Sequence, residues 1–295
     1  MVHHGKAAMV CLTQKTALAE FVERQRKGGA TLGFVPTMGA LHQGHLSLVD
    51  RSALECDCTV VSIFVNPTQF NQAEDLVLYP RPLKADMALL NVSSCGALFL
   101  PSVSEIYPGG AIVQQQWDFA GLDKGLEGQF RPGHFDGVAQ VVKILLECVQ
   151  PDVLYLGQKD YQQYAVVRKM VELEQLPVDV RVCPTIREHD GLAMSSRNVR
   201  LSIQERAQAT ELSRTLFALR DQLQGAGSCL PDMLAQARTW LAARPGITVE
   251  YLEAVDAETL SPVQHWNRTT TVLLCVAAWL GGVRLIDNVL VSHAG

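Results

Sequence analysis

The sequence predicts an α/β fold, with a doubly wound parallel sheet followed by a second, smaller C-terminal domain of α+β type. Up to about residue 183, apolar runs rich in β-branched residues alternate with segments of helical periodicity, which is typical of parallel strands joined by crossover helices. After that point, two helical stretches come first and strand-like runs follow. A chain of 295 residues with 48% apolar composition can bury two cores of ordinary size. We therefore expect one domain over residues 1–184 and another over 185–295.

The order of the elements follows from their periodicity. The strands expected in the first domain are 31–35, 59–65, 97–100, 153–156 and 178–183. The helices, with apolar residues three and four positions apart, are 17–27, 45–55, 83–92, 138–148 and 161–174. The second domain is expected to have helices 203–223 and 231–243, then strands 247–255, 271–279 and 283–290. The leader 1–13 is expected to be disordered or to form the edge of a strand.

Composition and charge favour a small-molecule partner over nucleic acid or a membrane. A net charge of −5 gives no overall attraction for polyanions, so an anionic ligand must be held by local groups. The eight cysteines form no C-x-x-C pair and are predicted to be reduced thiols. The N-terminus lacks the plan of a signal peptide, and no apolar run reaches the roughly 20 residues that span a bilayer. We expect a soluble, cytoplasmic protein.

Polar residues follow several of the predicted strands, where open α/β sheets bind their ligands. The first strand is followed by a turn with His42 and His45, and Gly39 and Gly44 allow a ligand to approach its backbone closely. Imidazole nitrogens there could donate to phosphate oxygens whose charge grows in a transition state. The alternatives are one capping and one merely exposed histidine, or a zinc pair, although no third ligand is obvious nearby.

Two further segments carry cations. Lys159 suits phosphate, and Asp160 suits Mg²⁺, although the two could equally form a surface ion pair. In the run MSSRN, Ser195, Ser196 and Arg197 could clamp a polyphosphate, or could belong to a capped turn.

The loop after the second strand and the helix after the fourth each carry a side-chain amide. Gln69 and Gln163 overlook one crevice if the sheet forms as expected, and they could donate to a carboxylate or hydroxyl, although surface glutamines are common. The loop 126–142 carries Glu127, Arg131 and His134 and is either a substrate loop or a plain connection.

The motifs together resemble a known family. The segment PTMGALHQGH is similar to the HIGH-type signature of the nucleotidyltransferase superfamily, and MSSRN is similar to its KMSKS-type counterpart. With SIFVNPTQF, YPR, RPGHFDGV, LGQKDYQQ and RLIDN, the chain resembles the pantoate–β-alanine ligase (pantothenate synthetase) family over about residues 15 to 290.

This resemblance implies a Rossmann-like N-terminal domain, a smaller C-terminal domain that closes over it, and a homodimer. It also implies that, with ATP and Mg²⁺, (R)-pantoate forms a pantoyl adenylate with release of pyrophosphate, and that β-alanine then displaces AMP to give pantothenate, the precursor of coenzyme A.

Carried over position by position, the resemblance implies a set of site residues. The ATP site corresponds to Met38, Gly39, Ala40, Leu41, His42, Gln43, Gly44, His45, Gly157, Gln158, Lys159, Asp160, Ile186, Met194, Ser195, Ser196 and Arg197. The proton donor of the family corresponds to His45, and its pantoate contacts correspond to Gln69 and Gln163, with Gln69 also near β-alanine. From their chemistry we add His42, Lys159 and Arg197 to the catalytic group and expect Asp160 to be the metal ligand.

The chain departs from the family pattern at a few places. Gln158 stands where many members have Glu, so we assign it no charged or metal role. MSSRN lacks the lysines of the synthetase-type signature, which leaves Lys159 and Arg197 as the main cations.

Two other functions are considered from the sequence. A different adenylyl-transferring enzyme, such as one acting on a phosphate-bearing nucleotide precursor, would share the histidines but would need more cations in its acceptor pocket, and the neutral Gln69 and Gln163 argue against it. A non-catalytic nucleotide-binding module would share the fold but would have little reason to keep both anion-binding loops together with the amides.

Overall fold

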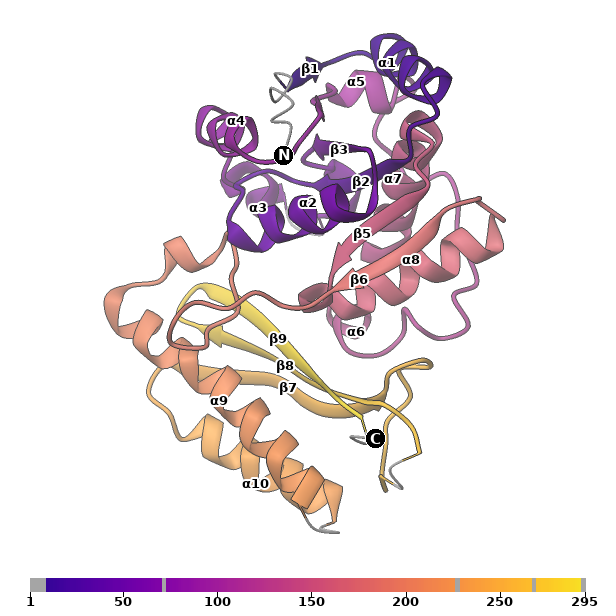
Figure 1. The fold of residues 1–295 in the computed structure, drawn as a ribbon. Helices are drawn as coiled ribbons and strands as arrows, with labels where there is room; N and C mark the ends of the chain where they lie inside the picture. Colours follow the sequence, from indigo (N-terminus) through magenta and orange to yellow (C-terminus); the bar gives the residue numbers. More distant parts are fainter. Residues whose placement is uncertain (1–8, 71–72, 226–228, 267–268, 293–295) are drawn as a thin grey trace, which may run out of the picture. The chain divides into compact units, whose positions relative to one another are not determined.

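The computed structural model describes residues 9–70, 73–225, 229–266 and 269–292 (Figure 1). This part of the chain forms two compact units. The first contains residues 9–119 apart from 71–72, together with Phe130–Gly157 and Val166–Cys183. The second contains Ala120–Gln129, Gln158–Ala165 and the described residues from Pro184 onward. The division expected between residues 184 and 185 stays a prediction, and each unit is treated below by itself.

The first unit is built on a parallel six-stranded sheet, which confirms the predicted α/β fold class. The sheet order is β1-β4-β3-β2-β5-β6. The strands are β1 Val10–Leu12, β2 Leu32–Thr37, β3 Cys58–Ile63, β4 Ala97–Phe99, β5 Val153–Gly157 and β6 Asp179–Cys183. Aliphatic side chains on the central strands, such as Val35, Val61 and Leu98, are fully buried, because a parallel sheet is covered on both faces.

Crossover helices connect these strands. The longer ones are α1 Lys15–Lys27, α2 Gln43–Glu55, α4 Leu83–Val92, α7 His134–Val149 and α8 Tyr161–Leu173. Short elements are η1 Pro67–Gln69, α3 Ala73–Leu78, α5 Val103–Ile106, α6 Glu127–Phe130 and η2 Gln158–Asp160. Helix α2 packs on β2, β3 and β5, while α1 contacts α7. Because parallel crossovers are right-handed, α2 and α4 cover one face of the sheet and α1 and α7 the other.

Two of the boundaries that differ from the sequence prediction have identifiable reasons, and the leader forms one of the two structures expected for it. Strand β2 continues to Thr37, because its pairing with β5 stops at Phe34 and the missing N–H of Pro36 costs no hydrogen bond on that side. Helix α7 starts at His134, four residues earlier than expected, since Gly133 supplies a left-handed backbone (φ 75°) just before it. In the leader, β1 pairs with β4, so its described end forms a sheet edge; residues 1–8 lie outside the described residues.

The second unit contains an antiparallel sheet and two long helices, which confirms its predicted α+β character. The helices are α9 Ile203–Gly225 and α10 Leu230–Ala242, and a short turn, η3 Asn198–Arg200, precedes them. The strands β7 Ile247–Asp256, β8 Val272–Leu280 and β9 Val283–Val291 pair in that order. Leu212 and Leu216 of α9 share a buried core with Val276 of β8, so the helices cover one face of this small sheet.

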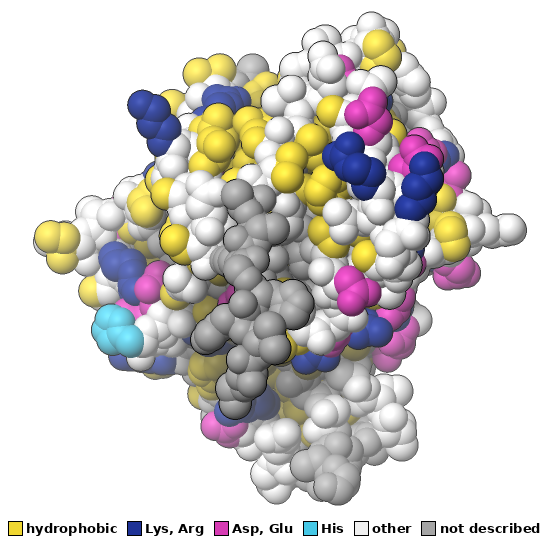
Figure 2. Space-filling model, turned by 45° about the horizontal axis from the view of Figure 1, so that its top comes forward, with side chains coloured by type: hydrophobic (Ala, Val, Ile, Leu, Met, Phe, Trp, Pro, Cys, Tyr) yellow, Lys and Arg dark blue, Asp and Glu magenta, His cyan; other side chains and the backbone are white. Residues whose placement is uncertain are grey.

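Charged side chains of both signs share one face of the molecule. On the face shown in Figure 2, the visible Lys and Arg side chains are interspersed with Asp and Glu. None of the helices in the described segments is both long and apolar enough to cross a bilayer.

Candidate functional site

The order of the strands points to one edge of the sheet of the first unit. From β2 the chain proceeds to β3 and β4 on one side, whereas β5 and β6 lie on the other side of β2. Ligands of open α/β sheets bind outside the carboxyl ends of the strands where the order reverses in this way. Strand β2 ends at Thr37, and the turn that carries the two histidines follows it; β5 ends at Gly157, and the segment with Lys159 and Asp160 follows it.

A buried carboxylate fixes the histidine turn, which we define as residues 38–45. Asp86 of α4 is only 2% exposed and accepts hydrogen bonds from the backbone N–H groups of Ala40 (2.9 Å) and Leu41 (2.8 Å). Gly39 has φ 86°, and a Cβ there would lie 3.1 Å from Asp86 Oδ2 and from Ile63 Cγ2. The turn therefore needs glycine at position 39, and Asp86 holds its backbone in place.

Both histidines use one ring nitrogen to start helix α2. His42 is the N-cap and its Nδ1 accepts from Gly44 N at 3.1 Å, while Nδ1 of His45 accepts from His42 N at 3.3 Å. An imidazole that accepts at Nδ1 carries its proton on Nε2, so each ring presents an Nε2–H donor. The ring centroids lie 4.1 Å apart. Both histidines thus cap the helix, whereas the alternative considered from sequence had one capping and one merely exposed histidine. The caps place the ring proton on Nε2, which is the tautomer that a phosphate-binding role requires.

The amide of Gln69 lies beside the histidine turn. Its Oε1 accepts from Asn66 Nδ2 (3.1 Å), which orients Nε2 toward Met38 Sδ at 3.1 Å. Asn66 is 1% exposed; its amide also donates to Gly137 O (3.1 Å), and its Oδ1 accepts from the Tyr107 hydroxyl (2.8 Å). A thioether is a weak acceptor, so this amide N–H is well suited to a stronger oxygen acceptor.

Helix α7 supports the segment that carries Gln69. Nδ1 of His134 lies 2.8 Å from the backbone oxygen of Gln69, and His134 is buried. A Cβ at Gly137 would lie 2.5 Å from Thr68 O, so this helix can approach η1 only with glycine there. His134 was expected in either a substrate loop or a plain connection, and it lies at the start of a helix, where it contacts the backbone of the amide segment.

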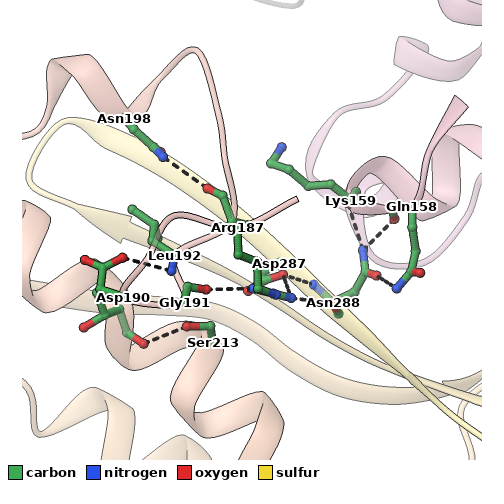
Figure 3. Close-up of polar contacts among 12 residues, drawn as sticks. Gln158, Lys159, Arg187, Asp190, Gly191, Leu192, Asn198, Ser213, Asp287 and Asn288 are labelled. Carbon is green, nitrogen blue, oxygen red and sulfur yellow. Dashed lines mark hydrogen bonds and ion pairs between the residues drawn. The ribbon is translucent and has the colours of Figure 1, made fainter. Parts of the chain in front are cut away.

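In the second unit, Asn288 of β9 holds the backbone around Lys159. Its Nδ2 donates to Gln158 O (3.0 Å) and Lys159 O (2.8 Å), and its Oδ1 accepts from Gln158 Nε2 (3.2 Å). Asn288 is 3% exposed. Figure 3 shows that the Lys159 side chain extends away from Asn288. The backbone of this segment is thus fixed, while its ammonium group extends away from the residue that anchors it.

A buried ion pair supports Asn288. Asp287 accepts from Arg187 Nη1 (2.6 Å) and Nη2 (2.9 Å), and its Oδ1 also accepts from Asn288 N at 2.7 Å (Figure 3). Burial raises the pKa of the Asp287 carboxyl, and the Arg187 guanidinium opposes this shift. The bidentate geometry favours the ionised pair. Arg187 also donates to Gly191 O at 3.1 Å, so one guanidinium fixes the loop that leads to MSSRN.

The loop from Ile186 to Arg197 brings further predicted residues together. Met194 N donates to Ile186 O (3.0 Å), and Ser195 Oγ accepts from Arg197 N (3.2 Å), so the MSSRN run does form a capped turn. Lys159, Ser195 and Arg197 line one small pocket of about 10 Å³, enough for about one water. Lys159 and Arg197 therefore lie at the same small pocket of the second unit, which is too small for a ligand larger than water to enter.

Asp160 offers a hard oxygen ligand. It is exposed, and its carboxylate lies 3.7 Å from the Lys159 ammonium, so the ion pair considered from sequence does form. Throughout the described segments, no group of three or more His, Cys, Asp or Glu side chains is placed to hold a metal ion. One exposed carboxylate still fits Mg²⁺, which commonly takes one or two carboxylates together with substrate phosphates.

Gln163 and Glu127 both lie in the second unit. Gln163 is half-buried in the first turn of α8, whereas Gln69 belongs to the first unit, so their convergence on one crevice stays a prediction. The neighbouring Gln162 donates to Leu122 O and Gly125 O and accepts from Glu127 N. Glu127 accepts from Arg284 (2.7 and 2.8 Å), and its buried side chain is part of the internal structure of this unit.

The structure thus groups the predicted residues by unit. In the first, the histidine turn lies against Gln69; in the second, Lys159 shares a pocket with Ser195 and Arg197. Sequence reasoning assigned no role to the residues that hold these groups in place. These residues are Asn66, Asp86, Gly137, Arg187, Asp287 and Asn288. The quoted motifs SIFVNPTQF, RPGHFDGV and RLIDN contain four of them, but residue type alone does not distinguish a support from a surface residue.

Comparison with known proteins identifies the family. The model of the family described as pantoate-beta-alanine ligase matches residues 10–290. The chain belongs to the pantoate-beta-alanine ligase family. A pantothenate synthetase from Bacteroides fragilis is 49% identical over 261 residues, covering 88% of this chain and 91% of the relative. The corresponding enzyme of Aeromonas hydrophila is 44% identical over 286 residues, covering 97% and 99%.

Solved structures of this family share the fold. Pantothenate synthetase from Thermus thermophilus superposes with a TM-score of 0.87 at 43% identity, covering 95% of this chain and 99% of the other. The pantoate-beta-alanine ligase of Francisella tularensis, described as complexed with beta-gamma ATP and beta-alanine, gives 0.75 at 35% identity, covering 96% and 98%. These likenesses confirm the predicted ligase family and its two-part architecture.

Proposed function

We propose that this protein condenses (R)-pantoate with β-alanine to give pantothenate, at the expense of ATP and through an enzyme-bound pantoyl adenylate. A pantoate carboxylate oxygen attacks the α-phosphorus, the bond to the bridging oxygen breaks, and pyrophosphate leaves. The amine of β-alanine then attacks the acyl carbon, the bond to AMP breaks, and the nitrogen loses a proton. The family supports the overall reaction, and the backbone hydrogen bonds accepted by Nδ1 of His42 and His45 are the structural observation that carries the proposal.

The histidines act as fixed donors to the phosphates. Because backbone N–H groups occupy both Nδ1 atoms, the Nε2–H groups of His42 and His45 are oriented before ATP binds. Donors that need no reorientation stabilise charge that develops in a transition state. We assign His45 as the proton donor and His42 as its partner, with the rest of residues 38–45 contacting the nucleotide.

The second unit supplies the cations. Lys159 and Arg197 neutralise the phosphates, with hydrogen bonds from Ser195 and Ser196. The remaining nucleotide contacts proposed for this side are Gly157, Gln158, Ile186 and Met194. When Mg²⁺ is bound, it supplies further positive charge to the phosphates, and Asp160 is the residue that we propose holds it. Two anionic reactants repel one another, so these charges are needed to bring them together.

Pantoate binds to neutral amides. Gln69 Nε2 is directed at the weak acceptor Met38 Sδ and can exchange it for a pantoate oxygen, and we assign Gln163 the same role from the second unit. Amides hold a carboxylate without neutralising it, which preserves the oxygen as a nucleophile. No protein nucleophile is required, since positioning and charge carry the catalysis.

An exchange assay tests the adenylate step. The enzyme should catalyse exchange of labelled pyrophosphate into ATP in the presence of pantoate and without β-alanine, and complete reactions should release AMP. Omitting each of ATP, pantoate and β-alanine in turn should abolish pantothenate formation. Release of ADP in place of AMP, or exchange that is independent of pantoate, would contradict the mechanism.

We further propose that the protein acts in the cytoplasm as a homodimer. The eight cysteines, which are free thiols in the structure, suit a reducing compartment. The dimer rests on the family resemblance. Sedimentation equilibrium should give twice the chain mass of 32.3 kDa, and a monomer over the whole concentration range would contradict it.

A further inference from the structure

A large groove lies between α9 and α10, on residues that the proposed reaction does not use. It has a volume of about 740 Å³, within the usual range of small-molecule sites. All of its lining residues belong to the second unit. The residues that matter for the argument are Thr215, Leu219, Met233, Trp240 and Arg244.

The groove combines an aromatic surface with unsatisfied donors. Trp240 is 42% exposed, and the Arg244 guanidinium carbon lies 3.7 Å from the centre of its ring. Arg244 Nε is buried and has no hydrogen-bond partner in the described structure. Thr215 is 5% exposed, and its Oγ1 is likewise buried and unpaired. Leaving a buried donor unpaired is costly, so two such atoms in one groove indicate a ligand with acceptor oxygens.

The charges in the groove favour an anion. Arg214 and Arg244 line it together with a single carboxylate, Glu211. Glu211 lies 2.7 Å from Arg214 Nη1 and 3.9 Å from Arg244 Nε, which is outside hydrogen-bond range. The groove therefore carries an excess of one positive charge, and Arg244 is the cation whose Nε is left unpaired.

We propose that this groove is a second ligand site that binds a small organic anion with a planar apolar body and one carboxylate. The carboxylate accepts hydrogen bonds from Arg244 and Thr215, and the ring packs against Trp240, Leu219 and Met233. An anion of this kind satisfies the unpaired donors, the excess charge and the exposed aromatic surface together. The proposal does not depend on the function assigned to the catalytic residues.

A direct test uses 2-naphthoate as the probe and the full chain as the protein. The probe should quench tryptophan fluorescence and bind one molecule per chain in calorimetry, and saturating ATP or pantoate should not displace it. The uncharged 2-naphthamide should bind about tenfold more weakly, since it loses a charge-assisted hydrogen bond. Competition by ATP or pantoate, equal binding of the amide, or no binding at millimolar probe would overturn the proposal.

Substitutions in the groove test whether the probe binds there. Arg244→Lys keeps the charge but removes Nε, and Thr215→Val keeps the shape but removes the hydroxyl, so each should weaken 2-naphthoate by about three- to tenfold. Arg238→Gln is the matched control, because Arg238 is an exposed residue of α10 that does not line the groove. Unchanged binding in both groove variants would overturn the proposal. So would a change in assembly mass on Trp240→Ala together with no probe binding, which would mean that a second copy fills the groove.

Discussion

The two groups of predicted site residues are held in different ways. In the histidine turn, backbone N–H groups fix the imidazoles themselves, and the Asp86 carboxylate fixes the backbone that precedes them. In the second unit, Asn288 and the Arg187–Asp287 pair fix only the backbone behind Lys159. Fixed donors suit a transition state, whereas long cationic side chains adapt to bound phosphates. We therefore expect substitutions in the first group to lower kcat and substitutions in the second group to raise KM for ATP.

The largest expected effect comes from His45. His45→Ala should lower kcat by roughly 10²–10³, the scale of losing one preorganised donor. His45→Gln should give a similar loss, although glutamine can keep the helix cap from the same position. Pyrophosphate release measures kcat, and the midpoint of thermal unfolding measures how much the helix cap stabilises the fold. A glutamine variant with full rate would show that His45 acts only as a cap.

The support beneath the turn should give the next largest effect. Asp86→Asn replaces one of two acceptors by a donor that faces a backbone N–H, which should cost about 1–3 kcal/mol of unfolding free energy. Because the turn then shifts, kcat should fall about tenfold while KM for ATP changes little. Asp50→Asn, on the exposed side of α2, is the control and should change neither. If Asp86→Asn raised KM for ATP and left kcat unchanged, the two units would not differ in the way proposed.

The corresponding change in the second unit is Asn288→Ala. It removes two donors from the carbonyl groups of Gln158 and Lys159, each worth about 1 kcal/mol. With this backbone released, KM for ATP should rise about fivefold and kcat should change less. Initial rates at saturating pantoate and β-alanine separate the two constants, and a fall in kcat alone would count against the proposed division of roles.

The smallest expected effect is on the pH dependence of unfolding, through an ion pair in the loop before MSSRN. The hydrogen bond from Arg206 lowers the pKa of Asp190. Such a carboxyl stabilises the fold above its unfolded pKa of about 3.9, and this contribution is lost as pH falls through the lower folded value. Asp190→Asn should therefore cost about 0.2–1 kcal/mol at pH 7 and almost nothing near pH 2. Denaturant unfolding at several pH values measures this, and an equal cost at both extremes would refute the assignment.

The sequence predicted the layout of the fold well because periodicity reports burial directly. Helix 83–92 and the strands near 97, 153 and 179 lie where the pattern places them. The start of α7 was missed, because the left-handed Gly133 that allows it has no signal in hydrophobic periodicity. The strand end at Thr37 was missed because it depends on which neighbours β2 has at that point.

The residue types of the candidate site could be proposed from the sequence, whereas the residues that support them could not. The sequence predicts an anion site because histidine, lysine and arginine residues occur in the segments that follow predicted strands. Asp86 lies 45 residues from the amide that it holds at Leu41, and Asn288 lies 129 residues from Lys159. Contacts of that separation depend on tertiary packing, which one sequence does not reveal.

The way in which α2 begins has one further consequence. A ring nitrogen can cap a helix only while it carries no proton, so the chemical form of His42 and His45 is tied to the folding of the segment that presents them. Acid that protonates either ring would therefore loosen the first turn of this helix as well as change the ring's charge. Nitrogen chemical shifts of the two side chains and amide exchange at Gly44 should move together during a pH titration.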